Sequence, residues 1–164
     1  MKNDAGNIET AADNLSAMVS FLQATADGLT AEQLHWKPST SEFSLVEHVC
    51  HLRDLEREGF GIRIERLLGE QNPVLPDFDG SAIALARDYN SSDFQVVLDE
   101  FGKARSANVA RLAALNASEL ARSGTQDGVG PVSLGDLPGK MREHDEAHRA
   151  EILELLGRLS CADD

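Results

Sequence analysis

The amino-acid sequence predicts an all-α fold, a four-helix bundle with long connections between its second and third helices and between its third and fourth helices. Two observations support this prediction. Four segments of about 20 residues carry apolar residues at spacings of three and four, the repeat of one helix face, and little of the chain alternates as a strand does. The segments between them are rich in Gly, Pro and Asp, which are typical of loops.

The first predicted helix extends from about Asn7 to Asp27 and ends at Gly28, a residue common after helix ends. The second begins after Ser44, where the Glu of "SLVE" completes a reciprocal capping box, and continues to Leu68. Their apolar stripes are Ile8, Ala11, Leu15, Met18, Val19, Leu22 and Ala26 in the first helix, and Leu45, His48, Leu52, Leu55, Gly59 and Ile62 in the second.

The third helix is predicted to open with a further capping box, "SDFQ" at Ser92. The fourth is predicted to begin at Pro138, with residues 133–137 as a separate turn, because a proline so far past a cap at Ser133 would break the first turn. Residues 71–90 and 117–132 are long connections that could cover one end of the bundle or be ordinary crossovers. The stripes are Phe94, Val97, Leu98, Phe101, Leu112 and Leu115, and then Met141, His144, His148, Ile152, Leu155 and Leu159.

The composition limits the partners of the chain. Its 164 residues are expected to form one domain over residues 1–164. Twenty-eight acidic and 15 basic residues give a formal net charge of −13, so nucleic acid and anionic membrane surfaces, which bind Lys and Arg clusters, are disfavoured. No apolar run approaches the ~20 residues of a membrane-spanning helix.

The cellular compartment is predicted from the start of the chain and from the cysteines. The segment "MKNDAGNIETAADN" has no apolar stretch behind its lysine, so it does not resemble a secretory signal. Cys50 and Cys161 are too few for a disulfide framework and fit a reducing compartment. We therefore expect a cytoplasmic protein, with Cys50 as a buried structural thiol and Cys161 in a frayed tail.

Histidines occupy core-facing positions on two helices. His144 and His148 lie in the stripe of the fourth helix, and His48 and His51 are three residues apart on the second. A buried imidazole needs a hydrogen-bond partner or a metal, because an unpaired buried polar group costs roughly 1–3 kcal/mol. Two histidines from one helix and one from another would form a three-nitrogen metal site with an open position, the catalytic type. The alternative is a set of core histidines that only form hydrogen bonds.

The run "HLRDLE" on the second helix, with "SLGDLPGKMREHDEAHRAEI" leading into the fourth, resembles the DinB superfamily of metalloenzymes. The resemblance extends to "LHWKPSTSEFSLVEH" and "LDEFGKARSANVARLAAL", so it covers most of the chain. It implies that His51, His144 and His148 bind the metal, which leaves His48 as a neighbouring polar group or a hydrogen-bond donor to a ligand. One departure is Pro138-Gly139, where the family usually has good helix formers.

The resemblance further implies an up-and-down-type bundle with one unusual long connection, a divalent ion that is typically nickel or zinc, and often a homodimer. An ion held by three neutral imidazoles should be a strong Lewis acid that lowers the pKa of a bound water or thiol, so hydrolysis and thiol transfer are both open. Several branches of the superfamily resemble thiol-dependent transferases or isomerases, which favours transfer of a low-molecular-weight thiol cosubstrate to an electrophilic small molecule. The alternatives are a metal-dependent hydrolase and a non-catalytic metal-binding or dimerisation module.

A zincin-type protease is not a good fit to the run "HDEAH". That motif needs Glu directly after the first His, where it activates the metal-bound water, and the residue here is Asp145.

Polar residues elsewhere are weaker candidates for substrate contacts. Arg105 and Asn108 interrupt the stripe of the third helix. We favour a structural pair between Arg105 and a carboxylate such as Asp54 or Glu56, because a charge is rarely buried unpaired, over contact with an anionic substrate. Before the second helix, Trp36 with His35 is predicted to plug the core or to wall a pocket.

Overall fold

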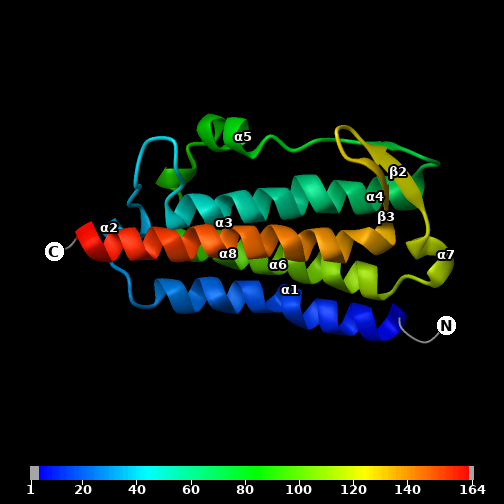
Figure 1. Ribbon diagram of the computed structural model, residues 1–164, viewed down its shortest axis with the longest axis horizontal. Helices are drawn as coiled ribbons and strands as arrows, with labels where there is room; N and C mark the ends of the chain where they lie inside the picture. The colour runs from blue at the N-terminus through cyan, green and yellow to red at the C-terminus, as the bar shows by residue number, and fades with distance from the viewer. Residues whose placement is uncertain (1–3, 163–164) are drawn as a thin grey trace.

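Four long helices form the body of the molecule (Figure 1). The structure is a computed structural model that describes the backbone of residues 4–162 and the side chains of residues 13–162. The first, third and fourth long helices are α1 (Asp4–Ala26), α6 (Phe94–Ala113) and α8 (Leu137–Ala162). The second is continuous and consists of α3 (Leu45–Asp54), a π-helical segment η1 (Leu55–Gly61) and α4 (Ile62–Gly69). The predicted all-α four-helix bundle is confirmed.

The order of helix directions differs from a simple up-and-down bundle. α1 packs against α6 and α8, and α3 also packs against α6 and α8, so α1 and α3 lie at opposite corners. Figure 1 shows α3 and α6 running in the same direction, opposite to α1 and α8. Ser44 before α3 donates a hydrogen bond to the side chain of Asn90 before α6, which places both starts at one end. The up-and-down order implied by the resemblance is therefore wrong here, because the chain between α4 and α6 returns along the whole bundle.

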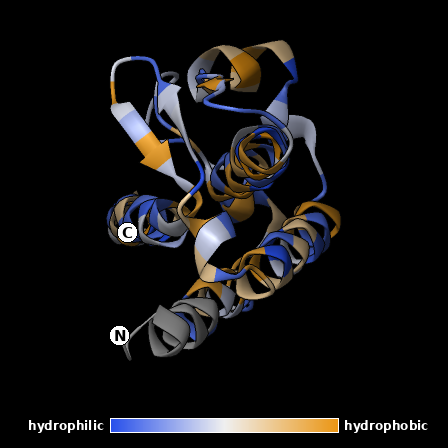
Figure 2. Ribbon diagram, turned by 90° about the vertical axis from the view of Figure 1, so that its right-hand side faces the viewer, coloured by the Kyte–Doolittle hydropathy of each residue, from blue (hydrophilic) through white to orange (hydrophobic). Residues whose placement is uncertain are grey.

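That returning crossover contains β1 (Val74–Leu75), the short helix α5 (Gly80–Ala86) and the 3-10 turn η2 (Tyr89–Ser91). Figure 2, which looks along the bundle, shows the crossover on the side of the bundle away from the N-terminal helix. Residues 71–90 are therefore a crossover that runs along one side of the bundle. The remaining short helices are α2 (Ala31–Leu34) and α7 (Ala117–Leu120).

A three-stranded sheet that the sequence pattern did not predict joins the two long connections. β1 pairs in parallel with β2 (Ser123–Gln126), which pairs antiparallel with β3 (Gly130–Ser133). A Cβ on Gly124 would lie 2.4 Å from the carbonyl oxygen of Pro73, so the connections meet too closely for a side chain there. Strands this short, with sequences such as SGTQ, lack the alternation of β-branched residues that predicts a strand.

Capping residues set the starts of α3 and α6. Ser44 and Glu47 form the predicted capping box at α3. At α6 the predicted cap is wrong by one residue. The side chain of Asp93, and not that of Ser92, accepts a hydrogen bond from the N–H of Val96 and so caps the start of α6.

The turn predicted before the fourth helix is the 3-10 turn η3 (Leu134–Asp136), which Ser133 and Asp136 cap reciprocally. α8 then begins at Leu137, one residue before the predicted start. Pro138 therefore lies in the first helical turn, where its missing N–H breaks no intrahelical bond.

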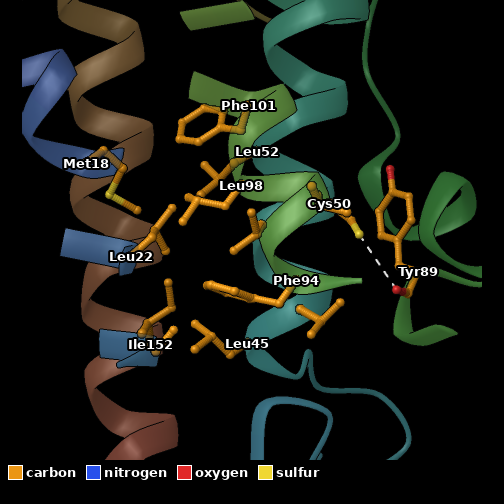
Figure 3. Packing of buried hydrophobic residues seen from close by; sticks show 14 of the residues in the cluster. Met18, Leu22, Leu45, Cys50, Leu52, Tyr89, Phe94, Leu98, Phe101 and Ile152 are labelled. Atoms are coloured by element: carbon orange, nitrogen blue, oxygen red, sulfur yellow. Dashed lines mark hydrogen bonds between the residues drawn. The ribbon is translucent and has the colours of Figure 1, made fainter. Parts of the chain in front are cut away.

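The predicted stripes form most of the core, and Figure 3 shows α1, α3, α6 and α8 contributing to one part of it. The second helix departs from its stripe after the π segment. Ile62 is 36% exposed, whereas Ile64 and Leu67 are fully buried, because the wider π turn changes which face meets the core. The side chains of Ile8 and Ala11 lie outside the described part of the chain.

Within residues 4–162, no helix is both long enough and apolar enough to cross a membrane.

Candidate metal centre

Three imidazoles from two helices meet where α3 faces α8. The Nε2 atom of His144 lies 3.2 Å from His51 Nε2 and 3.2 Å from His148 Nε2. His144 and His148 are four residues apart on α8, so they share the face that is turned to His51 on α3. The structure thus brings together the three residues that the resemblance indicates as metal ligands.

The spacing of these nitrogens fits a transition-metal ion. A tetrahedral ion with metal–nitrogen distances of about 2.0–2.1 Å holds its ligand nitrogens about 3.3–3.4 Å apart. One nitrogen of each ring lies within 4.8 Å of the other two. Imidazole suits zinc, nickel, iron and copper, so this donor set accepts such an ion without selecting one of them.

The histidines at this point are uncharged at neutral pH. Burial, together with the neighbouring histidines, lowers the pKa of His51 to about 4 and the pKa of His144 to about 3. Burial lowers the pKa of His148 to about 4, and burial with the other two rings lowers the pKa of His48 to about 3. Because a metal binds only the neutral imidazole, no proton has to leave these rings before an ion binds at neutral pH.

Hydrogen bonds between the histidines do not satisfy all of their nitrogens. A neutral imidazole has one N–H donor and one acceptor nitrogen. His144 Nε2 faces two nitrogens at 3.2 Å, and its single hydrogen or lone pair can serve only one of them well. His51 Nδ1 is buried and has no hydrogen-bond partner among the described residues. An ion shared by the three Nε2 atoms resolves their conflict, which hydrogen bonding alone does not.

Glu151 supports the ring of His148 from the other side. His148 Nδ1 lies 2.9 Å from an oxygen of the Glu151 carboxylate, whereas Nε2 of the same ring faces His144. His48 Nδ1 lies 3.0 Å from the same His148 nitrogen and 3.8 Å from the carboxylate. His48, His148 and Glu151 are thus a second close group, on the outer side of the His148 ring. This position agrees with the expectation that His48 is a neighbouring polar group.

The crossover lies against His51. A Cβ on Gly80, the first residue of α5, would lie 2.4 Å from Cε1 and 2.5 Å from Nδ1 of that ring, so only glycine fits without a shift. The rings of Phe78 and Phe43 also pack against His51, with centroid separations of 5.8 and 5.9 Å. These apolar neighbours disfavour the charged imidazole, which is the physical cause of its lowered pKa.

A cleft of about 530 Å³ opens beside the histidines, between the loop before α3, the start of α5 and the C-terminal half of α8. Its volume is in the range of small-molecule sites. Three of the four clustered histidines form part of its wall, which is lined by Pro38, Ser41, Glu42, Phe43, His48, His51, Gly80, Ser81, His148, Glu151, Glu154, Leu155 and Arg158.

A buried ionic network lies on the other side of α8. Arg105 of α6 donates to both carboxylate oxygens of Asp145 at 2.7 and 2.9 Å and to Glu56 at 2.9 Å. It also donates to the carbonyl oxygen of Leu15 at 2.9 Å. The predicted structural pair with Glu56 is confirmed, whereas the second partner, Asp145, was not predicted. Asp145 is therefore turned away from the histidines and cannot serve as the base of a zincin-type site.

Asn108 and Asp54, the other polar residues considered on these faces, also have structural partners. Asn108 donates to the backbone and side-chain oxygens of Glu56, within the π segment. Asp54 does not contact Arg105. It accepts hydrogen bonds from Arg53, Arg87 and Tyr89 instead.

The remaining candidates lie apart from the histidine cluster. Trp36 packs against the main apolar core, as the core-plug interpretation predicts. His35 Nδ1 lies 2.7 Å from the carbonyl oxygen of Asn90, which ties the loop before α3 to the crossover. Cys50 is buried, burial raises the pKa of its thiol, and its sulfur donates to the Tyr89 carbonyl oxygen (Figure 3). Cys161 is exposed in the last turn of α8.

The family follows from a comparison of the whole sequence with known families. The family model described as the DinB superfamily matches residues 15–152, which include most of the chain and all four clustered histidines. The chain belongs to the DinB superfamily. The histidine cluster and the topology described above therefore belong to a DinB protein.

Among solved structures, the DinB chain is similar to YfiT from Bacillus subtilis, described as "a probable metal-dependent hydrolase with an unusual four-helix bundle topology". The TM-score is 0.83 at 21% sequence identity, and the match covers 93% of this chain and 87% of the YfiT chain. A likeness at this identity establishes the shared fold. A search of curated proteins found no match.

Sequence reasoning missed two residues of the site. Glu151 lies on the polar side of the α8 stripe, and its contact with His148 could have been found from their spacing of three residues. Gly80 lies in a connection with no periodic pattern, and its place against His51 depends on the course of the crossover. No signal within the sequence pattern indicates that contact.

Proposed function

We propose that this DinB protein is a divalent-metal-dependent enzyme that transfers a low-molecular-weight thiol to an electrophilic small molecule. The observation that carries the proposal is the convergence of three uncharged Nε2 atoms, from His51, His144 and His148, beside a cleft large enough for a small molecule. Nickel or zinc is the ion that we expect. Such an ion, when bound, lowers the pKa of a thiol or water at its open position.

The protein's own groups orient the ligands and shape the site. The carboxylate of Glu151 lies 2.9 Å from Nδ1 of His148, the position from which a carboxylate orients a metal-bound imidazole. Gly80 and Phe78 fix the position of the His51 ring from the crossover side. The cleft then admits the reacting molecules from the side of His48 and Phe43.

The placement of carboxylates favours a thiol over water as the nucleophile. Asp145, next to His144, is bound by Arg105, and Glu151 contacts Nδ1 rather than Nε2 of His148. The three-histidine group itself contains no carboxylate to accept a proton from water. A thiol with an ordinary pKa of about 8.5 needs far less help than water, whose pKa is about 15.7.

Metal-dependent hydrolysis is the second candidate, and the likeness to YfiT, itself described as a probable metal-dependent hydrolase, favours it. The two reactions differ in one simple respect. Hydrolysis consumes only water, so turnover that persists without any added thiol supports the hydrolase and contradicts the transferase.

A metal-binding or dimerisation module without turnover predicts a closed coordination sphere and no substrate pocket. The cleft beside the histidines supports an enzyme instead. We also propose that the protein forms a homodimer, that it binds no nucleic acid and that it works in the cytoplasm. Light scattering tests the dimer, because a mass near that of one 17.7 kDa chain would contradict it.

Metal content is the first test. Elemental analysis of the purified, untagged protein is expected to find about one divalent ion per chain, as in other three-ligand sites. His51→Ala and His144→Ala should lose the ion, while the matched variant His48→Ala, which removes a neighbouring imidazole of the same type, should keep it. A wild-type protein that binds neither zinc nor nickel would remove the basis of the proposal.

Thiol transfer is the second test. The metal-loaded protein is incubated with a thiol and a panel of small electrophiles, and thioether products are measured by mass spectrometry. We expect a product whose formation requires the metal and is absent from His51→Ala. Metal-loaded protein with no conjugation across the panel, and no thiol-dependent change in its metal absorption spectrum, would refute thiol transfer.

A further inference from the structure

A second, smaller hollow of about 250 Å³ opens beside His51 and His144. His51 forms part of the wall of both hollows, so a ligand in the smaller one lies beside the same histidine cluster as a ligand in the cleft. The two hollows differ in charge. The lining of the cleft contains more carboxylates than cations, whereas among the described residues the smaller hollow is lined by two cations, Arg63 and Lys140, and by no carboxylate. The smaller hollow is therefore positively charged, in a chain whose formal net charge is −13.

Arg63 is a buried cation without an ionic partner. It is 6% exposed, and among residues 13–162 no carboxylate forms an ion pair with its guanidinium. Its Nε–H is buried and has no hydrogen-bond partner there, and its Nη2 donates only a long bond of 3.4 Å to the carbonyl oxygen of Pro76. Burial lowers the pKa of Arg63, and the charge of Asp77 does not outweigh this effect. Because a buried polar atom is ordinarily paired, the open Nε–H indicates an acceptor that the described chain does not supply.

The fold holds both cations close to the histidines. The guanidinium carbon of Arg63 lies 5.5 Å from the centroid of the Phe60 ring, one turn earlier in the same continuous helix. Lys140 lies one turn before His144 on α8, so the two side chains share a face of that helix and both line the hollow. Burial is the largest cause of the lowered pKa of His144, and the charge of Arg63 is one of the smaller causes, so the guanidinium lies near that ring.

The walls of the hollow favour a carboxylate as the missing acceptor. The guanidinium group has a planar fork of N–H donors that matches the geometry of a carboxylate. Four other lining residues are apolar, namely Leu55, Phe60, Phe78 and Val129. A phosphate ester carries nearly two negative charges at neutral pH, so it would lose more hydration against these walls than a carboxylate on a short apolar chain.

We infer that the smaller hollow is a carboxylate-binding pocket, in which Arg63 donates a charge-assisted hydrogen bond from Nε and Lys140 adds a second positive charge. The carboxylate belongs to the electrophile that reacts at the histidine cluster, because the larger cleft remains for the thiol. This second statement rests on the proposed function. It adds the chemical class of the electrophile, a small molecule that bears a carboxylate.

Propionate, its neutral amide propionamide and inorganic phosphate test the pocket. Each is titrated into the ¹⁵N-labelled full chain, with and without bound zinc, and dissociation constants are read from the backbone amide signals of Gln126 and Val129, which line the hollow. We expect propionate to bind at least about tenfold more tightly than propionamide in both forms, the order of effect of one hydrogen bond to a charged group, and to shift the Nε–H signal of Arg63. Propionate binding that requires zinc would indicate direct coordination to the metal and overturn the pocket. Tighter binding of phosphate than of propionate would overturn the assignment to a carboxylate.

Variants show which residues hold the carboxylate. Arg63→Met should abolish the preference for propionate, and Lys140→Gln should reduce it severalfold. Arg57→Met removes an exposed arginine outside the lining, changes the net charge by the same amount as Arg63→Met, and should leave the preference unchanged. A preference that survives in Arg63→Met, or that Arg57→Met loses as well, overturns the inference.

Stability separates a ligand-binding arginine from a structural one. Arg63→Met removes a buried charge that has no ionic partner among the described residues, so its melting temperature should stay constant or rise. A melting temperature that falls far below that of Arg57→Met would identify Arg63 as a structural residue and contradict the inference.

Inhibition connects the pocket to the reaction. In the zinc-loaded protein, propionate should raise the KM of the electrophile found by the thiol-transfer assay without lowering kcat, and propionamide should not. Propionate that binds at Arg63 without such inhibition overturns the assignment to the electrophile. A protein that binds propionate yet transfers no thiol refutes the proposed function and the identity of the ligand, while the carboxylate pocket stands. Absence of propionate binding in a protein that transfers thiols overturns the inference and leaves the proposed function intact.

Discussion

Two polar clusters are buried in this bundle on different sides of α8, and they satisfy their hydrogen bonds in opposite ways. In the Arg105 network, one guanidinium meets Asp145, Glu56 and the Leu15 carbonyl oxygen, all at 2.7–2.9 Å. In the histidine cluster, one nitrogen faces two others and His51 Nδ1 has no partner among the described residues. The first cluster satisfies its hydrogen bonds as folded, whereas the second leaves nitrogens that hydrogen bonds within the cluster do not satisfy.

The two clusters therefore differ in role. The Arg105 network stabilises the fold, whereas the histidine cluster is available to bind a ligand. Arg105 lies on a helix that carries none of the clustered histidines, yet it binds the segment after His51 through Glu56 and the residue after His144 through Asp145. It thereby ties together the two helices that carry the histidines. The Arg105 network has all of its hydrogen bonds satisfied and so stabilises the positions of these two helices. The histidines with unsatisfied nitrogens are thereby kept in place.

Removing the guanidinium of Arg105 should have the largest effect on stability. Arg105→Met leaves Asp145 and Glu56 as buried carboxylates without their cation, so the free energy of unfolding should fall by about 3–5 kcal/mol. Urea denaturation of the metal-free protein measures the loss. Arg57→Met, which removes a half-exposed arginine from a 3.7 Å pair, is the matched control and should change stability by less than about 0.5 kcal/mol. Similar losses in both variants would contradict the structural role of the network.

A substitution in the histidine cluster, in contrast, should not destabilise the metal-free protein. His51→Leu removes an imidazole whose Nδ1 is unpaired, so the metal-free free energy of unfolding should stay constant or rise. The wild type should instead gain about 2.7 kcal/mol when metal is present at a hundred times its dissociation constant, and the variant should gain nothing. Denaturation with and without zinc measures both values. A metal-free variant destabilised by several kcal/mol would indicate that the histidines are structural core residues.

The smallest effect concerns the cover of the site. Gly80→Ala places a Cβ within 2.5 Å of the His51 ring, so either α5 or the imidazole must move, and metal affinity should fall about tenfold, at the lower end of changes that disturb ligand orientation. Competition with a coloured chelator measures the affinity. Gly157→Ala on α8, where a Cβ meets nothing within 4 Å, should leave metal affinity unchanged and raise stability slightly. Equal affinities of the wild type and Gly80→Ala would show that the crossover does not position His51.

The bundle could be predicted from the sequence because the buried faces of its helices produce a periodic pattern of apolar residues. Apolar residues at helical spacing marked four helices, and the capping box at Ser44 located the start of α3 to the residue. The sheet could not be predicted in this way, since β1 and β2 are short and belong to two different connections that are far apart in the sequence. The π segment was also missed. Its effect appears only in the structure, where Ile64 and not Ile62 lies on the buried face of the helix.

The candidate site could be predicted as far as its spacing along helices allowed. His144 and His148 follow from a single stripe, and the choice of His51 over His48 depended on the family resemblance and not on geometry. The partners of these residues come from other elements. Asp145 meets Arg105, and Gly80 meets His51, across interfaces that periodicity does not describe. The candidate ligands could therefore be found from local sequence patterns, whereas the residues that contact them are known only from the tertiary structure.

The returning crossover has a consequence for how such a protein can diversify. It is tied at one end by the pairing of β1 with β2 and at the other by the hydrogen bonds of Asn90, and between these points it contributes Gly80 and Ser81 to the cleft. Insertions and exchanges in this stretch alter the mouth of the site without changing any helix of the bundle. New substrate ranges can therefore arise in one loop by recombination or loop grafting, while the proposed metal site is kept as long as Phe78 and Gly80 keep their contacts with His51.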